Sequence, residues 1–416
     1  MNVIGKFEQC FKNYVKLDSR GITKNEQNLF IISSFDNFIK KIKTSNDTSF
    51  SYYTIQETFR TKTEHYQLWG VDSFLMPYNI MLSIFSNQGN LGEVFEEFLF
   101  FIFSIAEGDD YVCVCSNDVN QSLYKPIINN IQDIIYVPKE SLKWTAPIED
   151  EYLFGEYIKI YKRCENGFIP VLDANIFKYN KQDVVDISSN FFTLDCIHNN
   201  LKHVYESKLF KNIDVIFYEK YKKEFLPDFY KFICVLLSIT VLLINGVKPS
   251  SKKRGSVLRL LLNMFFELSF IENFNIMQNK ELIEKLIATF VINLKNYLGI
   301  NTSYSLEDLV RIFNFEIDRI NNKHNIEYII KMVRKINDFS TNNLSFKLLE
   351  YKENFGLIPK VVLKVMVDYG IIDKTIYNIV LNKFIYNSNV SVIPINKNDS
   401  INDEFLQNIF LMQRSK

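Results

Sequence analysis

The spacing of apolar residues changes along the chain, and this change limits the folds that the chain can adopt. In the first half, residues 52–59 alternate between apolar and polar, and residues 110–115 also have the pattern of a short strand. From residue 227 onward, apolar residues recur at intervals of three and four, which predicts amphipathic helices. These predicted helices span 227–245, 255–275, 279–298, 305–319, 324–340, 344–352 and 359–384. Strand patterns followed by a run of helices predict an α+β core and a separate all-α domain.

The length and composition are consistent with two folded domains. A chain of 416 residues with 47% hydrophobic residues can bury more than one core. We expect the core domain over residues 1–215 and the helical domain over residues 216–416. Lys+Arg and Asp+Glu balance at 48 each, so the chain has no overall basic field. Binding to nucleic acid would therefore require a local cationic patch.

The cysteine and histidine pattern predicts no metal site. None of the six cysteines forms a C-x-x-C pair, and the four histidines complete no zinc set of known spacing. Reduced cytosolic thiols are the simplest interpretation. The longest apolar run, 232–244, is too short to span a bilayer, and the N-terminus lacks the layout of a signal peptide. We therefore expect a soluble cytoplasmic protein without membrane contact.

Residues 245–263, NGVKPSSKKRGSVLRLLLN, join a polar turn to an apolar helix pattern and carry a cluster of cations. Gly246, Pro249 and the serines break regular structure, so the cluster should lie at or just before a helix N-terminus. Backbone N–H groups and cationic side chains at such a position can bind an anion, with phosphate as the natural candidate. The alternative is a solvated surface loop before a core helix. The predicted contact residues are Lys248, Lys252, Lys253, Arg254 and Arg259.

This segment resembles the R-G-Y-V-L-R-R region of alanyl-tRNA synthetases, which follows D-G-V-x-P-S in that family. The match has no gap and covers Gly246, Val247, Pro249, Ser250, Arg254, Gly255, Val257, Leu258 and Arg259. In the family this region begins the helical part that meets the acceptor stem of tRNA. The resemblance therefore implies that tRNA is a partner and that the five cations contact it.

Residues 51–72 resemble motif 2 of the same family, S-Q-K-C-I-R-A-G-G-K-H-N-D-L. Gln56, Arg60 and His65 match it in one register. In class II synthetases the arginine that ends this strand contacts the α-phosphate of ATP, where a guanidinium neutralises developing charge. The resemblance thus implies that Arg60, Gln56 and His65 bind ATP, which would enter with Mg²⁺. Without the resemblance, Arg60 would be interpreted as a surface residue.

Residues 185–201 lie where the family has motif 3, V-D-T-G-M-G-L-E-R. Val185 and Asp186 match it. The resemblance implies that Asp186 holds the α-ammonium group of a small amino acid, and that Asp186 and Arg60 are the catalytic residues. The alternative is that Asp186 caps a helix. Thr193 replaces the motif 3 arginine, which contacts adenine and the γ-phosphate in class II enzymes, and a neutral threonine supplies no comparable charge.

Other segments complete the prediction. The second half of motif 2, with its histidines, is absent, and the segment that frames the amino-acid pocket in the family is replaced by 117–150, predicted to be polar and irregular. We also expect a helix over 3–16, a strand that passes into a helix over 28–42, a buried helix over 93–106 and a hairpin over 157–170.

The resemblance implies a class II synthetase-like antiparallel sheet with flanking helices, followed by an all-α domain of the tRNA-recognition type. It implies a diverged alanyl-tRNA synthetase-like protein that acts on an amino acid, ATP or aminoacyl-tRNA, as a ligase or an acyl transferase. Because Thr193 replaces the motif 3 arginine, ordinary alanylation is not expected. The alternative is a non-catalytic synthetase paralogue that binds tRNA or a protein partner.

Overall fold

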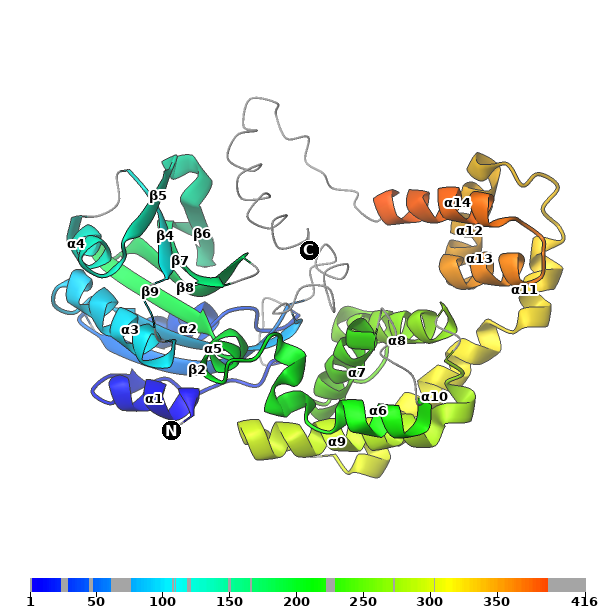
Figure 1. The fold of residues 1–416 in the computed structure, drawn as a ribbon, viewed down its shortest axis with the longest axis horizontal. Coiled ribbons are helices and arrows are strands. Elements are labelled where there is room, and N and C mark those ends of the chain that lie inside the picture. Colours follow the sequence, from blue (N-terminus) through cyan, green and yellow to red (C-terminus); the bar gives the residue numbers. More distant parts are fainter. Residues whose placement is uncertain are drawn as a thin grey trace. The chain divides into compact units, whose positions relative to one another are not determined.

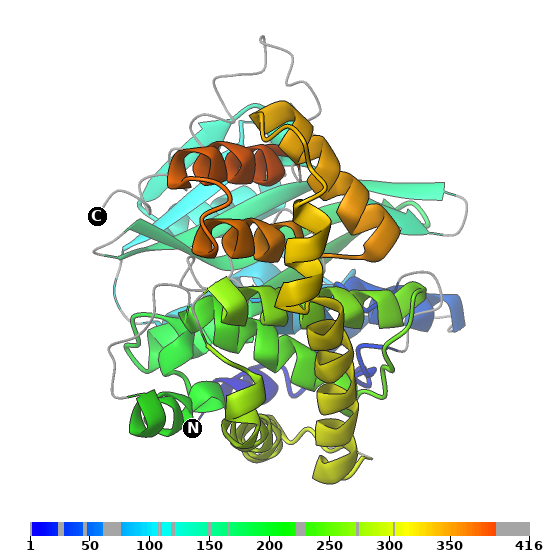
Figure 2. The ribbon, with the colours of Figure 1, turned by 90° about the vertical axis from the view of Figure 1, so that its right-hand side faces the viewer.

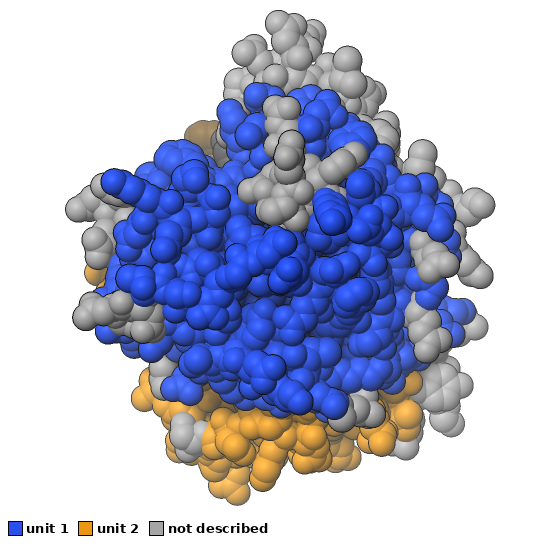
Figure 3. Space-filling view, turned by 90° about the vertical axis from the view of Figure 1, so that its left-hand side faces the viewer, with its two compact units in different colours: residues 1–60, 77–207, 394–416 blue, residues 61–76, 208–393 orange. Residues whose placement is uncertain are grey.

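The computed structural model divides the chain into two compact units (Figures 1 and 3). Unit 1 consists mainly of residues 1–60 and 77–207, and unit 2 begins at Lys208. The structure describes residues 2–23, 29–44, 48–60, 76–106, 108, 110–117, 121–148, 151–164, 167–221, 229–271, 274–302 and 304–387. Among these residues, no helix is both long enough and apolar enough to cross a membrane.

Within the described residues, nine strands of unit 1 form one sheet in the order β1-β2-β3-β9-β8-β7-β4-β5, with β6 paired to β7. The strand pairs are antiparallel except for β1–β2 and β4–β5. The strands are β1 (Val15–Lys16), β2 (Ser51–Phe59), β3 (Tyr78–Ser86), β4 (Tyr111–Ser116), β5 (Asp133–Val137), β6 (Lys143–Ile148), β7 (Glu151–Cys164), β8 (Gly167–Tyr179) and β9 (Gln182–Asn190).

One face of the sheet is covered by helices α1 (Val3–Cys10), α3 (Leu91–Ile105) and α5 (Phe191–His198), which contact one another (Figure 1). Aromatic side chains fill this interface, and Phe7 of α1 packs against Phe98 of α3 and Tyr53 of β2. Their rings are 5.9–6.1 Å apart at edge-to-face angles, a favourable geometry for buried aromatic pairs. Helix α4 (Gln121–Asn130) packs against α3.

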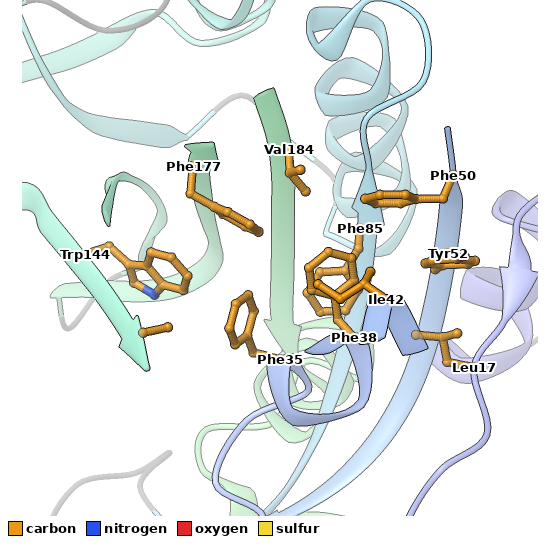
Figure 4. Close-up of a cluster of buried hydrophobic side chains, with 11 residues drawn as sticks. Leu17, Phe35, Phe38, Ile42, Phe50, Tyr52, Phe85, Trp144, Phe177 and Val184 are labelled. Carbon is orange, nitrogen blue, oxygen red and sulfur yellow. The ribbon is translucent and has the colours of Figure 1, made fainter. Parts of the chain in front are cut away.

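The opposite face of the sheet carries helix α2 (Phe35–Thr44), whose apolar side chains cover β2, β3, β8 and β9 (Figure 4). Phe38 of α2 stacks on Phe85 of β3 with the ring centroids 4.6 Å apart. Trp144 of β6 stacks on Phe177 of β8 at 5.2 Å and closes the other side of the cluster. This aromatic cluster leaves the adjoining part of the same face to polar side chains, which are described below.

Unit 2 is all-α in its described part, and its elements follow one another as packed antiparallel or crossing helices (Figure 2). In α7 the run 232–244 is buried, which explains its uniform hydrophobicity. The helices are α6 (Ile213–Tyr221), α7 (Phe229–Ile244), α8 (Lys253–Ile271), α9 (Lys280–Leu298), α10 (Leu306–Lys323), α11 (Ile326–Val333), α12 (Thr341–Phe355), α13 (Pro359–Asp368) and α14 (Lys374–Asn387).

The structure confirms the predicted fold class, an α+β core with an antiparallel sheet and flanking helices, followed by an all-α region. The strands predicted at 52–59 and 110–115 and the buried helix at 93–106 are present as β2, β4 and α3. The hairpin expected over 157–170 is present as the ends of β7 and β8 that face each other.

Several local predictions were wrong, among them the helix predicted over 324–340, which ends at Val333. The first helix ends at Cys10 rather than near residue 16, because Val15 and Lys16 pair with β2 and the Leu17 N–H donates to the Tyr53 carbonyl. The strand expected at the start of 28–42 is not formed in the described residues, although the helix that follows it is α2. The predicted helix 359–384 is two helices, since Gly370 adopts a left-handed φ of +65° after α13.

The segment 117–150 is also more regular than its polar sequence predicts. It contains α4, β5 and β6, and β5 extends the sheet by pairing parallel to β4. Most side chains of β5 are exposed or half-buried, so the strand lacks the apolar alternation by which strands are recognised. Pairing with a neighbouring strand, rather than local pattern, determines its conformation.

Candidate functional site

Strands β2 and β3 form a continuous antiparallel hairpin, paired from Ser51 and Ser86 to Phe59 and Tyr78. Arg60 follows the last paired residue, as predicted. Its backbone N–H donates to the Pro77 carbonyl at 2.8 Å and its Nε to the Ile32 carbonyl at 3.1 Å. The side chain is exposed. The structure therefore fixes the position of Arg60 through backbone contacts while its guanidinium reaches solvent.

Gln56 of β2 points to the same side of the strand as Arg60, and its hydrogen bonds give it a structural role. Its side chain is fully buried, its Oε1 accepts hydrogen bonds from the Arg20 N–H at 3.0 Å and from the Asn37 amide, and its Nε2 donates to the Arg20 carbonyl at 2.6 Å. These bonds hold the segment before α2 on the sheet. The predicted nucleotide contact of Gln56 stays a prediction. His65, the third predicted ATP residue, lies outside the described residues.

Asp186 lies in the middle of β9, so it does not cap a helix. The N-cap of the following helix α5 is Asn190, whose Oδ1 accepts the Phe192 N–H at 2.9 Å. In the sheet, Asp186 is directly opposite Phe85 of β3 and Asn175 of β8. Residues directly opposite in paired strands point to the same face, so Asp186 lies on the face that carries α2.

The carboxylate of Asp186 is buried and incompletely paired. Its exposed fraction is 5%, and its Oδ2 accepts a long hydrogen bond of 3.4 Å from the Asn175 Nδ2. The Oδ1 of Asp186 and the Oδ1 of Asn175 both have no hydrogen-bond partner among the described residues. Burial raises the pKa of Asp186 to about 7, the Asn175 hydrogen bond opposes this rise, and the nearby Asp173 adds to it.

Two further side chains belong to this polar part of the face, and the sequence analysis did not identify either. Tyr157 of β7 is opposite Asn175, which places Asp186, Asn175 and Tyr157 in one row across three strands. Burial raises the pKa of Tyr157 to about 12, with Asp173 and Asp186 adding to the rise and Arg60 opposing it. The charges of Arg60 and Asp186 thus act on the same phenol. The sequence contained a signal for Asn175, because Asp173 and Asn175 are polar residues at alternate positions within the apolar run of residues 168–177.

The aromatic cluster beside Asp186 explains its low exposure. Phe85 and Phe177 of that cluster are cross-strand and diagonal neighbours of Asp186, and both are buried (Figure 4). Apolar rings provide no hydrogen bonds to replace water, so the ionised carboxylate is disfavoured there. Thr193, at the position of the motif 3 arginine, is buried in α5 and supplies no cation.

In unit 2, the cationic segment forms the loop between α7 and α8. Gly246 ends α7 with a φ of +78°, and α8 begins at Lys253, so the cations lie at the helix start as predicted. A Cβ on Gly255 would lie 2.5 Å from the Lys248 carbonyl oxygen and 2.7 Å from the Ser250 nitrogen. The loop and helix therefore pack at a distance that only glycine allows.

The side chains of this segment differ in their surroundings. Lys248, Lys252 and Lys253 are exposed, and Lys253 has a φ of +49°, which is uncommon for a residue with a side chain. Arg254 is half-buried. The Arg259 Nε lies 3.7 Å from Oε2 of Glu316, a buried carboxylate. Arg259 thus has an internal partner in α10, and its predicted tRNA contact stays a prediction.

Among the comparisons with known proteins, the one with solved structures finds similar chains. Neither a protein-family model nor a curated protein matches the sequence. Among solved structures, the histidyl-tRNA synthetase of S. aureus is 7% identical, with a TM-score of 0.32 over 49% of this chain and 71% of that one. A pyrrolysyl-tRNA synthetase of Desulfitobacterium hafniense is 9% identical, with a TM-score of 0.29 over 49% and 70%. The HisG:HisZ ATP phosphoribosyl transferase complex of Thermotoga maritima is 9% identical, with a TM-score of 0.31 over 45% and 96%.

Each of these likenesses covers about half of the chain. At such identities and TM-scores they place the chain in no family, and they transfer no activity, substrate or partner to it. The described residues also contain no group of three side chains arranged to hold a metal ion.

Proposed function

We propose that unit 1 is a diverged class II synthetase-like core, of the alanyl-tRNA synthetase kind, that binds a small amino acid through Asp186. The observation that carries this proposal is the pair of buried oxygens, Asp186 Oδ1 and Asn175 Oδ1, that lack hydrogen-bond donors. Buried polar atoms without partners are uncommon in folded proteins, and a bound ligand, ion or water is one explanation for each of them. Both oxygens are acceptors, so the ligand group that fits them is a donor.

An α-ammonium group has the chemistry that this position lacks. It carries a positive charge and three N–H donors, whereas the adjacent Phe85 and Phe177 provide neither. Binding would replace the unpaired buried carboxylate by an ion pair with charge-assisted hydrogen bonds. The same binding would lower the pKa of Asp186 from about 7, because a nearby positive charge favours the ionised form.

Arg60 supports an amino acid rather than a simple amine as the ligand. Its guanidinium and the Asp186 carboxylate both influence the Tyr157 hydroxyl, although Asp186 lies level with Tyr52 near the start of β2 and Arg60 follows the end of that strand. A ligand with an ammonium group for Asp186 and an anionic group for Arg60 matches this charge distribution. The anionic group would be the carboxylate of the amino acid or, in an activating enzyme, the α-phosphate of ATP bound with Mg²⁺.

Two functions are candidates for a protein that binds an amino acid in this way, an enzyme and a non-catalytic paralogue. Arg60 and Asp186 support activation or acyl transfer, on an amino acid or an aminoacyl-tRNA. Thr193 favours the second candidate, a non-catalytic paralogue, because its buried hydroxyl cannot replace an arginine that neutralises phosphate charge. We prefer an enzyme with altered chemistry, in which ordinary alanylation does not occur.

Two measurements test this proposal. Calorimetric titration with each amino acid should detect binding of at least one small amino acid, and Asp186→Asn should weaken it by roughly 30-fold or more. Asp183→Asn is the matched control, because Asp183 is an exposed carboxylate of the same strand, paired with Lys178. If no amino acid binds the wild-type protein, or if both variants bind it equally well, the proposal is wrong.

ATP–pyrophosphate exchange with each amino acid then separates the two candidates. Exchange that Arg60→Ala abolishes supports the enzyme, with Arg163→Ala as the control for loss of an exposed arginine in unit 1. Amino-acid binding without exchange, and without transfer from a charged tRNA, supports the non-catalytic paralogue.

For unit 2, we propose that the segment 248–254 contacts the phosphate backbone of tRNA. The exposed side chains of Lys248, Lys252 and Lys253 on a tightly packed loop support this proposal. Changing Lys252, Lys253 and Arg254 together to Ala should weaken tRNA binding and reduce its dependence on salt by about one unit of slope for each lost phosphate contact. Unchanged affinity and slope would exclude the segment as an RNA contact.

A further inference from the structure

A pocket of about 480 Å³ lies in unit 2 beside the cationic segment. This volume is within the range of pockets that bind small organic groups. One wall is the loop before α8, and the other is α10 with the residue that precedes its N-cap. The lining residues are Lys248, Pro249, Tyr304, Asp308, Arg311, Ile312, Phe315 and Glu316.

The wall from α10 is one continuous helical stripe. Asp308, Arg311, Ile312 and Phe315 recur at intervals of three and four, so their side chains share one face of the helix. Phe315 has an exposed fraction of 68%, which is unusual for an aromatic side chain that lines a pocket. It therefore presents a flat apolar ring that the protein itself does not cover.

The opposite aromatic side chain, Tyr304, lies beside the turn at Gly246. Its Cε2 and hydroxyl oxygen are 3.5 Å from the position that a Cβ on Gly246 would occupy, an ordinary van der Waals distance. Gly246 ends α7 in a left-handed conformation. The pocket thus has a tyrosine just before α10 and an exposed phenylalanine on α10.

The two acidic side chains that line the pocket are paired with arginines, and the cation at its edge is Lys248. Arg311 is paired with Asp308 at 2.6 Å, and Glu316 with Arg319 at 2.8 Å. Lys248, by contrast, forms no ion pair with any of the described carboxylates and is exposed. Both acidic groups of the lining are therefore compensated within the protein, while the cation of the loop is available to an anion.

An aromatic ring to stack on, joined to cations for phosphate, is the chemistry that binds single-stranded nucleic acid. We propose that this pocket takes one unstacked nucleobase of the RNA whose backbone lies along Lys248, Lys252 and Lys253, with the base against Phe315. This proposal rests on the proposed RNA contact of the segment 248–254 and adds to it a site for a base.

The test uses the full chain and two RNA probes, a short hairpin with a single-stranded extension and the same hairpin with a blunt end. Phe315→Ala should weaken binding of the extended hairpin by about tenfold or more, without changing the salt slope or the affinity for the blunt hairpin. Phe346→Ala is the matched control, since Phe346 is an exposed phenylalanine of α12 with an exposed fraction of 64% and lies outside the pocket.

A fluorescent base analogue, placed at each position of the extension in turn, gives a second readout. Quenching at one position that Phe315→Ala removes and Phe346→Ala retains is the expected result. Equal effects of the two Phe variants, or equal weakening of both hairpins by Phe315→Ala, would overturn the base site.

The outcomes also separate this inference from the proposal on which it rests. If the triple variant of Lys252, Lys253 and Arg254 loses affinity and salt slope while Phe315→Ala changes neither probe, the RNA contact stands and the base pocket is wrong. If the wild-type protein binds neither hairpin, both proposals are wrong. If Phe315→Ala changes only self-association in analytical ultracentrifugation, the pocket is a protein interface and the base site is excluded.

Discussion

The two units present their candidate functional charges in opposite ways. In unit 1, one carboxylate is buried beside aromatic rings, and its neighbours leave one of its oxygens without a donor. In unit 2, several lysines are exposed on a loop whose backbone packs too closely for any residue but glycine at position 255. The first arrangement suits selective recognition of one small group. The second suits electrostatic contact with an extended polyanion.

The comparison also shows two ways in which a site can lower stability. Asp186 is unfavourable because an ionised carboxylate there loses its hydration and gains only one long hydrogen bond, from Asn175. Lys253 is unfavourable because a residue with a Cβ occupies a left-handed backbone conformation. Residues that are unfavourable for folding and yet present are candidates for function. Four predictions test whether the two units differ in this way.

The largest expected effect concerns the loop of unit 2. Gly255→Ala should destabilise unit 2 by about 2–3 kcal/mol, because the added Cβ would overlap the Lys248 and Ser250 backbone. Urea unfolding followed by circular dichroism measures the change. Gly299→Ala is the control, since Gly299 has a positive φ but open space around its Cβ, and its cost should be closer to ~1 kcal/mol. Equal costs would show that the packing of the loop is not tight.

The second prediction concerns the stability cost of Asp186. The pKa of Asp186 is raised in the folded protein, so the folded state binds its proton more strongly than the unfolded state does. This stabilising contribution is complete below pH ~4 and is lost as the pH rises through about 7. At pH 8, Asp186→Asn should therefore raise the free energy of unfolding by on the order of 2 kcal/mol.

The pH dependence distinguishes this effect from a general one. The advantage of Asp186→Asn in thermal unfolding should shrink as the pH falls from 8 toward 4, where the wild-type carboxyl is already neutral. Asp183→Asn is the control, because it removes an exposed carboxylate of the same strand that is paired with Lys178. An advantage that is constant with pH would contradict the assigned cause.

The third prediction concerns ligand affinity. A ligand ammonium group requires ionised Asp186, whose pKa is about 7 in the free protein. The association constant of the amino acid should therefore rise about tenfold between pH 6 and pH 8 and then level off, because the ionised fraction rises from roughly a tenth to roughly nine tenths. Calorimetric titration across this range measures it. A flat profile would mean that Asp186 does not contact the amino group.

The smallest expected effect concerns Lys253. Lys253→Gly should stabilise unit 2 by about 0.5–1 kcal/mol, because glycine adopts a positive φ without strain. The same variant should weaken RNA binding slightly and lower its salt slope by about one unit. Lys252→Gly removes an equivalent exposed charge without relieving strain at Lys253, so it should affect RNA binding alone. If Lys253→Gly destabilises the protein, the conformation of Lys253 is not strained.

Local pattern predicted most elements whose side chains alternate clearly between core and solvent. Strand β2 and helix α3 are present where their apolar spacing placed them, and the helices of unit 2 follow their predicted order. Prediction failed where pairing or a single backbone conformation decides the structure. Strand β5 has little apolar alternation, and Gly370 divides a continuous apolar pattern into α13 and α14.

The same distinction applies to the residues of the candidate sites. Position in sequence alone was enough to place Arg60 at a strand end and the cations at a helix start, because both are local features. Strand pairing was needed to bring Asn175 and Tyr157 beside Asp186, since these three residues lie on three successive strands and meet only through the register of β7, β8 and β9.

The sequence by itself determined the change from strands to helices along the chain and the residues that carry charge at element ends, because both depend on short-range periodicity and breaker residues. Only the tertiary structure decided which polar atoms are left without partners. The unpaired oxygens of Asp186 and Asn175 result from burial by the aromatic side chains of α2, β6 and β8. Burial and cross-strand pairing join distant parts of a chain, so the physical cause of this site is non-local.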